Sequence, residues 1–324
     1  MAKAIVIREY GAADRLVLEP ITLDPPAADE IQIRQTAIGV NYHDVYVRSG
    51  LYKTLTLPGI PGCEAAGVVD AIGADVTGLA VGDRVAYVTG GYGAYASHRT
   101  LPAHLAIQIP VDVTDETAAS NLLRAMTVDM LTTQVCTLRA GMTVLVHAAA
   151  GGVGRMLCQM AATLGATVIG TVGSAQKAQI AQASGCNHTV LYREVDFATS
   201  VAEITKGAGV DVVYDSVGAD TFAGSLEALA PCGHLVNFGQ SSGPVDPVLM
   251  STLAAKSLTV SRPILFHYLR DPNQYQTIGK RVMDNFQSGV LNTGAHSPVA
   301  LKDAAQAHAT LENMTGGGSL VLIP

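Results

Sequence analysis

The chain contains 324 residues and carries a formal net charge of −7; 48% of its residues are hydrophobic and 15% are charged. This length is typical of two domains, and the acidic balance argues against general nucleic-acid binding. We expect no membrane span, because no apolar run reaches about 18 residues, and no signal peptide, because MAKAIVIREYG lacks an apolar core. The five cysteines are scattered and odd in number, which favours the reduced thiols of a cytoplasmic protein over a disulfide framework.

The first 120 residues are predicted to be rich in β-structure. Short apolar and β-branched runs predict strands at 4–8, 16–19, 31–37, 65–72 and 84–88. Turn-forming clusters such as Asp24-Pro25-Pro26 separate them. A helical pattern begins at about residue 114, so this region ends where the helix starts.

Residues 143–177 carry the most informative pattern in the chain. A β-branched run at 143–148 is followed by small residues, by a helical pattern from about 153 to 164, and by a second buried run at 167–171. Strand, tight turn, helix and strand form the βαβ unit of a dinucleotide site, in which backbone N–H groups at the helix start hold a pyrophosphate. The turn reads AxGxxG, because Ala149 stands where such motifs usually begin with glycine, and it places Gly152 and Val153 at the pyrophosphate.

The end of the second strand indicates which nicotinamide cofactor binds. An NAD site usually has Asp or Glu there, to accept from the ribose 2′-hydroxyl. This chain has Gly173, Ser174 and then Lys177, which offer donors and no carboxylate. We therefore predict NADPH rather than NADH. The alternative is that Lys177 is an ordinary solvated helix residue.

Alternating strands and helices continue beyond this unit, and they predict a parallel, doubly wound sheet. Further strands are expected at 210–214, 234–238 and 258–261. Ligands bind at the carboxyl ends of such strands, so Ser216, Phe238 and Gly239 are candidate cofactor contacts. After about residue 266, helices at about 272–287 and 301–313 and a strand at 319–323 indicate that the chain returns to the first domain.

Several motifs in one order carry a family resemblance over nearly the whole length. They are AIGVNYHDVYVRSGLY (37–52), PGCEAAGVV (61–69), VGDRVAY (81–87), HAAAGGVG (147–154), GTVGSAQKA (170–178), VVYDSVG (212–218), FGQSSG (238–243), SRP (261–263) and SLVLIP (319–324). The chain resembles the zinc-independent, zeta-crystallin-like quinone oxidoreductases of the medium-chain dehydrogenase/reductase superfamily. The resemblance implies an α/β protein with a GroES-like β-rich domain at 1–122, completed by 267–324, and a Rossmann domain at 123–266. It also implies a homodimer.

The same resemblance implies the site residues. Asn41, Asp44, Tyr46 and Tyr52 are expected near the nicotinamide, with Asn41 and Tyr46 as donors and Tyr52 beside a quinone ring. The alternative for each tyrosine is a partly buried core residue with its hydroxyl in water. Tyr192 is expected near the 2′-phosphate, and Leu265 and Phe266 near the carboxamide. We expect catalysis mostly by positioning, with the proton supplied by solvent or a tyrosine.

We predict no metal site. Where zinc-dependent relatives carry their ligands, this chain has Asn41 to Asp44 and Cys63-Glu64, so the metal-binding imidazole is replaced by a thiol. Cys63 is more consistent with a packed residue. Some relatives carry an arginine near the C-terminus that reaches the cofactor phosphate, and Met314 stands about there, which predicts a weaker preference for NADPH.

The leading functional hypothesis is an NADPH-dependent quinone reductase acting on a small-molecule acceptor. An alkenal or enone reductase is the alternative among enzymes, because hydride delivery to an activated alkene needs almost the same site. A non-catalytic NADPH- or RNA-binding protein is a third reading, which the acidic balance disfavours.

Overall fold

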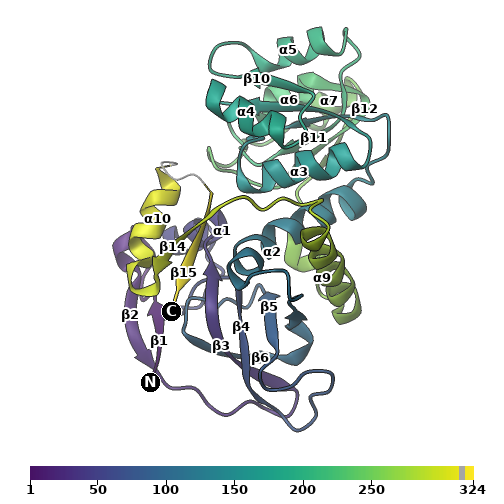
Figure 1. Cartoon of the computed structure of the whole chain (residues 1–324). Coiled ribbons are helices and arrows are strands. Elements are labelled where there is room, and N and C mark those ends of the chain that lie inside the picture. The colour runs from purple at the N-terminus through teal and green to yellow at the C-terminus, as the bar shows by residue number, and fades with distance from the viewer. Residues whose placement is uncertain (314–317) are drawn as a thin grey trace. The chain divides into compact units, whose positions relative to one another are not determined.

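The computed structural model describes residues 1–313 and 318–324 (Figure 1). The chain divides into two compact units. The first comprises Met1–Leu123, Leu269–Ser288 and Thr293–Pro324, and the second comprises Arg124–Tyr268 and Gly289–Asn292.

The first unit is built on an antiparallel sheet around the long strand β3 (Glu30–Gly39). Burial alternates along the first half of β3: Ile31 and Ile33 are fully buried, and their neighbours are not, as expected for a strand with one face on a core. The other strands are β4 (Glu64–Ile72), β5 (Arg84–Val88), β6 (His98–Pro102), β7 (Ile107–Gln108), β14 (His296–Ala300) and β15 (Ser319–Ile323). A separate two-stranded sheet pairs β1 (Ala2–Val6) with β2 (Val17–Ile21).

Helices α1 (Tyr42–Ser49), α9 (Pro272–Gln287) and α10 (Ala304–Glu312) belong to this unit. The C-terminal helix α10 packs on α1 (Figure 1). Arg48 at the end of α1 is 3% exposed and binds both oxygens of Glu312, at 2.9 and 2.7 Å. Because this guanidinium is buried and bidentate, the pair fixes the two helices more firmly than an exposed ion pair would.

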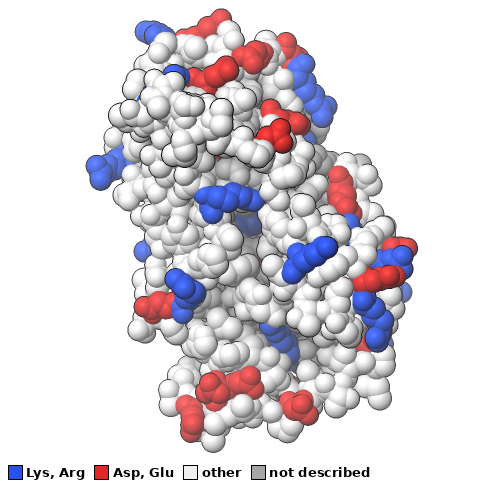
Figure 2. Space-filling view, turned by 180° about the vertical axis from the view of Figure 1, so that it is seen from behind, with Lys and Arg blue, Asp and Glu red and all other residues white. Residues whose placement is uncertain are grey.

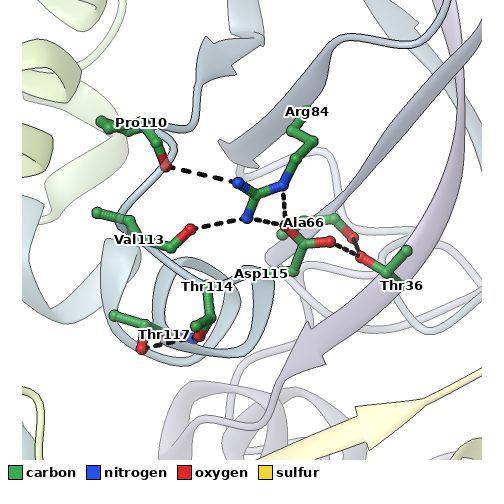
Figure 3. A network of polar contacts seen from close by, with 8 residues as sticks. All are labelled: Thr36, Ala66, Arg84, Pro110, Val113, Thr114, Asp115 and Thr117. Atoms are coloured by element: carbon green, nitrogen blue, oxygen red, sulfur yellow. Dashed lines mark hydrogen bonds and ion pairs between the residues drawn. The ribbon is translucent and has the colours of Figure 1, made fainter.

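The start of α2 (Asp115–Met130) is anchored to the sheet by a polar network, drawn in Figure 3. Arg84 of β5 donates to Asp115 from both Nε and Nη2, at 2.9 and 2.6 Å, and Thr36 of β3 donates to the same carboxylate at 2.6 Å. Arg84 also donates to the carbonyl oxygen of Val113 at 2.7 Å. Helix α2 then crosses from the first unit into the second between Leu123 and Arg124.

The second unit holds a six-stranded parallel sheet with strand order β10-β9-β8-β11-β12-β13 and helices on both faces (Figure 1). The strands are β8 (Thr143–Val146), β9 (Thr167–Val172), β10 (His188–Leu191), β11 (Val210–Asp215), β12 (Leu229–Asn237) and β13 (Thr259–Ser261). The helices that follow them are α3 (Gly152–Thr163), α4 (Ala175–Ala183), α5 (Phe197–Ile204), α6 (Phe222–Ala228), α7 (Met250–Ala254) and α8 (Leu265–Tyr268). In order of sequence this is 3-2-1-4-5-6, the order of dinucleotide-binding sheets, whose crevice opens between β8 and β11.

The predicted fold class is confirmed, and some element boundaries were wrong. The first strand ends at Val6 rather than residue 8, because the amide of Ile7 bonds to Gly59. The strand expected to reach residue 148 ends at Val146, because Ala148 has a positive φ of 51° and turns the chain. Strands β6, β7, β10 and β14 were not predicted.

Two observations on the described residues concern helix hydropathy and surface charge. Within residues 1–313 and 318–324, no helix is long and apolar enough to cross a bilayer. On the face drawn in Figure 2, Lys and Arg side chains are interspersed with Asp and Glu rather than gathered into a basic stripe.

Candidate active site

The predicted dinucleotide turn lies between β8 and α3. The amide of Gly151 donates to the carbonyl oxygen of Ala148 at 2.8 Å, which closes the turn, and α3 starts at Gly152 and Val153. A Cβ on Gly154 would lie 3.0 Å from backbone atoms of Ala148 and Ala149, and closer still to the Ala148 carbonyl oxygen. The turn therefore brings its backbone to the helix start as a phosphate-binding turn requires.

The departure from a leading glycine has a local explanation. Ala149 is fully buried, and its amide donates to Thr171 of β9 at 3.1 Å. Its Cβ lies against Gly170, where an added Cβ would come within 2.6 Å of it. Gly170 of β9 is thus the small residue where the turn packs on β9, and it leaves room for alanine at position 149.

A buried histidine lies at the end of β8, directly before the dinucleotide turn. His147 follows β8, and its two ring nitrogens lie 2.9 Å from the hydroxyls of Thr171 and Ser225. Burial lowers the pKa of His147 to about 4, so the ring is neutral at pH 7. One ring nitrogen then donates to a hydroxyl and the other accepts from one, which satisfies both.

The predicted 2′-phosphate residues are brought together at the ends of β9 and β10. Ser174 caps α4, its hydroxyl accepting from the amide of Lys177 at 3.3 Å. A Cβ placed on Gly173 would lie 2.9 Å from the hydroxyl of Tyr192 and 3.3 Å from Nε of Arg193. Gly173, Ser174, Lys177 and Tyr192 therefore lie in one neighbourhood, and all but Gly173 are exposed.

Arg193 is a cation that the sequence reasoning missed, although it stands next to Tyr192 in the same LYR motif. In the described part of the chain, neither Lys177 nor Arg193 forms an ion pair. Two exposed cations beside a helix N-terminus can both receive an anion.

Ser216, Phe238 and Gly239 also meet at strand ends. The carboxylate of buried Asp215 accepts from the amides of Val217 and Gly218, at 2.7 and 3.1 Å, and fixes the loop that carries Ser216. The amide of Phe238 donates to the Asp215 carbonyl at 2.8 Å. A Cβ on Gly239 would lie 2.6 Å from the Ser216 carbonyl oxygen, so the two loops touch.

Leu265 and Phe266 open the short helix α8 after β13, with Leu265 buried and Phe266 partly exposed. Arg262 donates to the carbonyl oxygen of Asn237 at 3.1 Å and so joins the ends of β13 and β12. This contact gives Arg262 a structural role. Met314 lies outside the described residues.

In the first unit, Asn41 and Asp44 form a capping box at the start of α1. Asp44 accepts from the amide of Asn41 at 2.8 Å and from the hydroxyl of Tyr95 at 3.2 Å. The side-chain nitrogen of Asn41 donates to Glu64 at 2.6 Å. Asn41, Asp44 and Glu64 are all buried, so the predicted donor Asn41 is held by two carboxylates. Asp44 acts here as a helix-capping residue, and its catalytic role stays a prediction.

Tyr46 and Tyr52 lie within an aromatic cluster with Tyr42, His43 and Tyr92. The rings of Tyr46 and Tyr52 are 5.0 Å apart, and those of Tyr42 and Tyr46 are 5.3 Å apart. His43 lies 5.7 Å from Tyr52 and is stacked with Tyr92 at 5.9 Å. All of these residues except buried Tyr92 are partly exposed, and such a group of rings favours a flat, apolar ligand.

Two titratable groups near this cluster are neutral at pH 7. Burial lowers the pKa of His43 to about 4, so it holds no proton to give as a cation. Burial, and then the charges of Asp44 and Glu64, raise the pKa of the Cys63 thiol well above its ordinary value. A cysteine binds a metal as the deprotonated thiolate. Because this environment favours the neutral thiol, it opposes metal binding at Cys63. Across the described residues, no group of three or more His, Cys, Asp or Glu is placed to hold a metal.

The buried histidines predict a loss of stability in mild acid. His147 and His308 are at most 1% exposed, and burial lowers their pKa values from 6.5 to about 4 and about 3. The unfolded chain therefore binds more protons, and stability falls as the pH drops below 6.5. Between pH 7 and pH 5 we expect each histidine to cost about 2 kcal/mol of unfolding free energy.

Urea unfolding at the two pH values measures this loss, and the variants His147→Gln and His308→Gln should each show a smaller dependence on pH. An equal pH dependence in wild type and both variants would contradict the assignment.

Two family models match the chain. One is described as an alcohol dehydrogenase GroES-like domain and covers residues 27–111; the other is described as a zinc-binding dehydrogenase and covers residues 152–283. A quinone oxidoreductase of Pseudomonas aeruginosa is 41% identical, with 100% of both chains aligned. A 2-haloacrylate reductase of a Burkholderia species is 40% identical over 100% of this chain and 99% of its own length.

A solved structure is similarly close. The structure of Escherichia coli quinone oxidoreductase complexed with NADPH superposes with a TM-score of 0.95 at 40% identity, covering 99% of this chain and 100% of that one. The match extends over both units, so it includes the dinucleotide turn and the aromatic cluster.

Proposed function

Because the chain belongs to the quinone oxidoreductase family of the medium-chain dehydrogenase/reductase superfamily, we propose that it is an NADPH:quinone oxidoreductase. The observation that carries the cofactor assignment is the pair of exposed cations, Lys177 and Arg193, beside Gly173 and Ser174. A carboxylate at this place would repel a 2′-phosphate, whereas donors and cations bind it.

The residues of the second unit fit this cofactor. The turn formed by Gly151, Gly152 and Gly154 offers backbone N–H groups to the pyrophosphate at the start of α3. Tyr192 and Lys177 offer a hydroxyl and an ammonium to the 2′-phosphate, and Ser216 and Gly239 line the ends of the neighbouring strands. Leu265 and Phe266 follow the last strand and offer backbone groups to the carboxamide.

The residues of the first unit provide positioning rather than acid–base chemistry. NADPH supplies a hydride when it is bound. Asn41 and Tyr46 donate hydrogen bonds to the oxygen that gains charge, and Tyr52 packs on the flat acceptor. His43 is neutral at pH 7, so the proton that completes the reduction comes from solvent or from a tyrosine hydroxyl.

The proposal includes independence from zinc, although one matching family model is described as zinc-binding. The raised pKa of Cys63 and the commitment of Glu64 to Asn41 support it. We also propose a homodimer, because β13 lies at the edge of the parallel sheet and Val260 is only half-buried. An edge strand of this kind pairs readily with its copy.

A second function has its own support. The similarity to a 2-haloacrylate reductase favours reduction of an activated carbon–carbon double bond. Quinones and α,β-unsaturated carbonyl compounds both accept a hydride at a carbon conjugated to a carbonyl. The same donors would then stabilise the oxygen of either acceptor.

Oxidation of NADPH and NADH with a panel of acceptors tests the proposal. A small benzoquinone, a larger ortho-quinone and an α,β-unsaturated ketone cover the two acceptor classes. Faster oxidation of NADPH with the quinones is the expected result, and it should survive prior dialysis against a zinc chelator. Turnover of the ketone alone would replace the quinone assignment, and binding of NADPH without turnover of any acceptor would contradict both.

A further inference from the structure

We propose that Glu64 is the residue that positions the Asn41 side chain, and that it does so by fixing which end of the Asn41 amide is free to donate. This inference rests on the proposed function, in which Asn41 donates to the reacting oxygen. Glu64 lies at the start of β4 and is fully buried.

The two carboxylate oxygens of Glu64 accept from two N–H donors. Oε1 accepts from Nδ2 of Asn41 at 2.6 Å, and Oε2 accepts from the backbone amide of Leu123 at 2.7 Å. Both lengths are those of strong hydrogen bonds to a carboxylate. Because a carboxylate only accepts, it must face the NH₂ end of the Asn41 amide.

The backbone leaves room for this arrangement at one glycine. Gly39 ends β3, and a Cβ there would lie 2.7 Å from the carboxyl carbon of Glu64. The strand register, which pairs Ile38 with Ala65, brings the carboxyl group to this place. Because Gly39 has no side chain, the Glu64 carboxylate fits beside the end of β3.

The orientation of Asn41 follows from these contacts. The capping box occupies its oxygen with the amide of Asp44, and Glu64 takes one of the two amide hydrogens. A single N–H remains, and its direction is set by Glu64. An amide held at both ends is a preorganised donor, whereas a free amide rotates and loses its preference between donor and acceptor.

The variant Glu64→Gln tests the inference. Its side chain has the same shape but only one accepting end. If that end stays with the amide of Leu123, its NH₂ group faces Asn41 and turns the Asn41 amide over. We expect turnover to fall by between about 10-fold and 100-fold, with less effect on KM for the acceptor.

A double-mutant cycle separates positioning from a general loss of structure. If Glu64 acts through Asn41, then Glu64→Gln should reduce kcat when Asn41 is present. The same substitution should have no further effect when it is added to Asn41→Ala. An equal loss in both backgrounds, or no loss in wild type, would overturn the inference. Wild-type turnover in Asn41→Ala would instead contradict the catalytic assignment of Asn41 in the proposed function.

Two further measurements keep the test independent of activity. The side-chain amide protons of Asn41, followed by NMR, should exchange slowly with solvent in wild type and rapidly in Glu64→Gln; slow exchange in both would also overturn the inference. The matched control is Asp115→Asn, which changes a partly buried carboxylate of the Arg84 network to an amide. This control should keep kcat within about twofold and leave the Asn41 amide protected, because Asp115 makes no contact with Asn41 in the described structure.

Discussion

Replacing both Lys177 and Arg193 with alanine is expected to weaken NADPH binding by about 100-fold and to leave NADH binding nearly unchanged. Each exposed cation is expected to contribute roughly 1.4 kcal/mol to binding a 2′-phosphate, or about tenfold, below the value for a buried charge-assisted bond. Only NADPH carries that phosphate. The loss should therefore appear in the ratio of the two cofactors rather than in folding.

The single variants test how the two cations share the phosphate. Lys177→Ala alone should already reduce the difference in affinity between NADPH and NADH. Arg193→Ala should reduce this difference by a similar amount. Raised salt should weaken NADPH binding to wild type more than to the double variant. Fluorescence titration of both cofactors at two ionic strengths measures all of these effects.

Arg139→Ala is the matched control. Arg139 is exposed and precedes β8, at the amino end of the strand rather than the carboxyl end where ligands bind. Its removal makes the formal charge of the second unit more negative by one, as either single variant does. If Arg139→Ala lowered the affinity for NADPH relative to NADH as much as Lys177→Ala does, the general charge of the unit would explain the preference for NADPH, and a phosphate site would not.

The dinucleotide-binding unit was predictable because its signals are local. The run β8, turn, α3 and β9 lies within about 30 residues, and each segment has its own periodicity. Ser174 was predicted as a phosphate donor from its place after the second strand, and the structure adds that it caps α4. These residues contact neighbours in the sequence, so the sequence pattern carries the information.

Arg193 was missed because its position depends on a strand that the pattern did not reveal. Strand β10 is only four residues long, and His188 at its start is exposed. Its register pairs Leu191 with Val172. Gly173, directly after β9, and Arg193, two residues after β10, therefore emerge at the same edge of the sheet. A cation twenty residues from Gly173 becomes a neighbour only through that pairing.

The contact between Asn41 and Glu64 illustrates the same limit in the antiparallel sheet. Asn41 and Asp44 were predicted as site residues by resemblance, but neither the capping box that they form nor the helix that it starts was predicted. The partner of the Asn41 side chain comes from β4, and its identity depends on the register of β3 against β4. Periodicity predicts that both strands exist and does not fix how they align.

The variant Gly154→Val is expected to abolish binding of both cofactors, with a loss of at least about 100-fold for each. A valine side chain would overlap the carbonyl oxygen of Ala148, which is backbone and closes the turn through Gly151. Relief of that overlap requires α3 to move away from the turn. The overpacking should also cost about 1–3 kcal/mol of unfolding free energy.

Two glycines provide graded controls for this prediction. A Cβ on Gly151 would lie 3.1 Å from the same carbonyl oxygen, so Gly151→Ala should weaken binding less than Gly154→Val does. A Cβ on Gly91, in the first unit, would meet only the Thr89 hydroxyl at 3.4 Å, so Gly91→Ala should bind both cofactors as wild type does. Isothermal titration with NADPH and NADH orders the three variants.

The pattern across the two cofactors separates the two parts of the site. NADPH and NADH share the pyrophosphate, so damage to the turn must weaken both by the same factor. Lys177 and Arg193 face a phosphate that only NADPH carries, so their loss must change the ratio. A Gly154→Val protein that kept NADH while losing NADPH would place the 2′-phosphate, and not the pyrophosphate, at the start of α3. The dinucleotide would then lie in the opposite direction along the sheet from the one proposed.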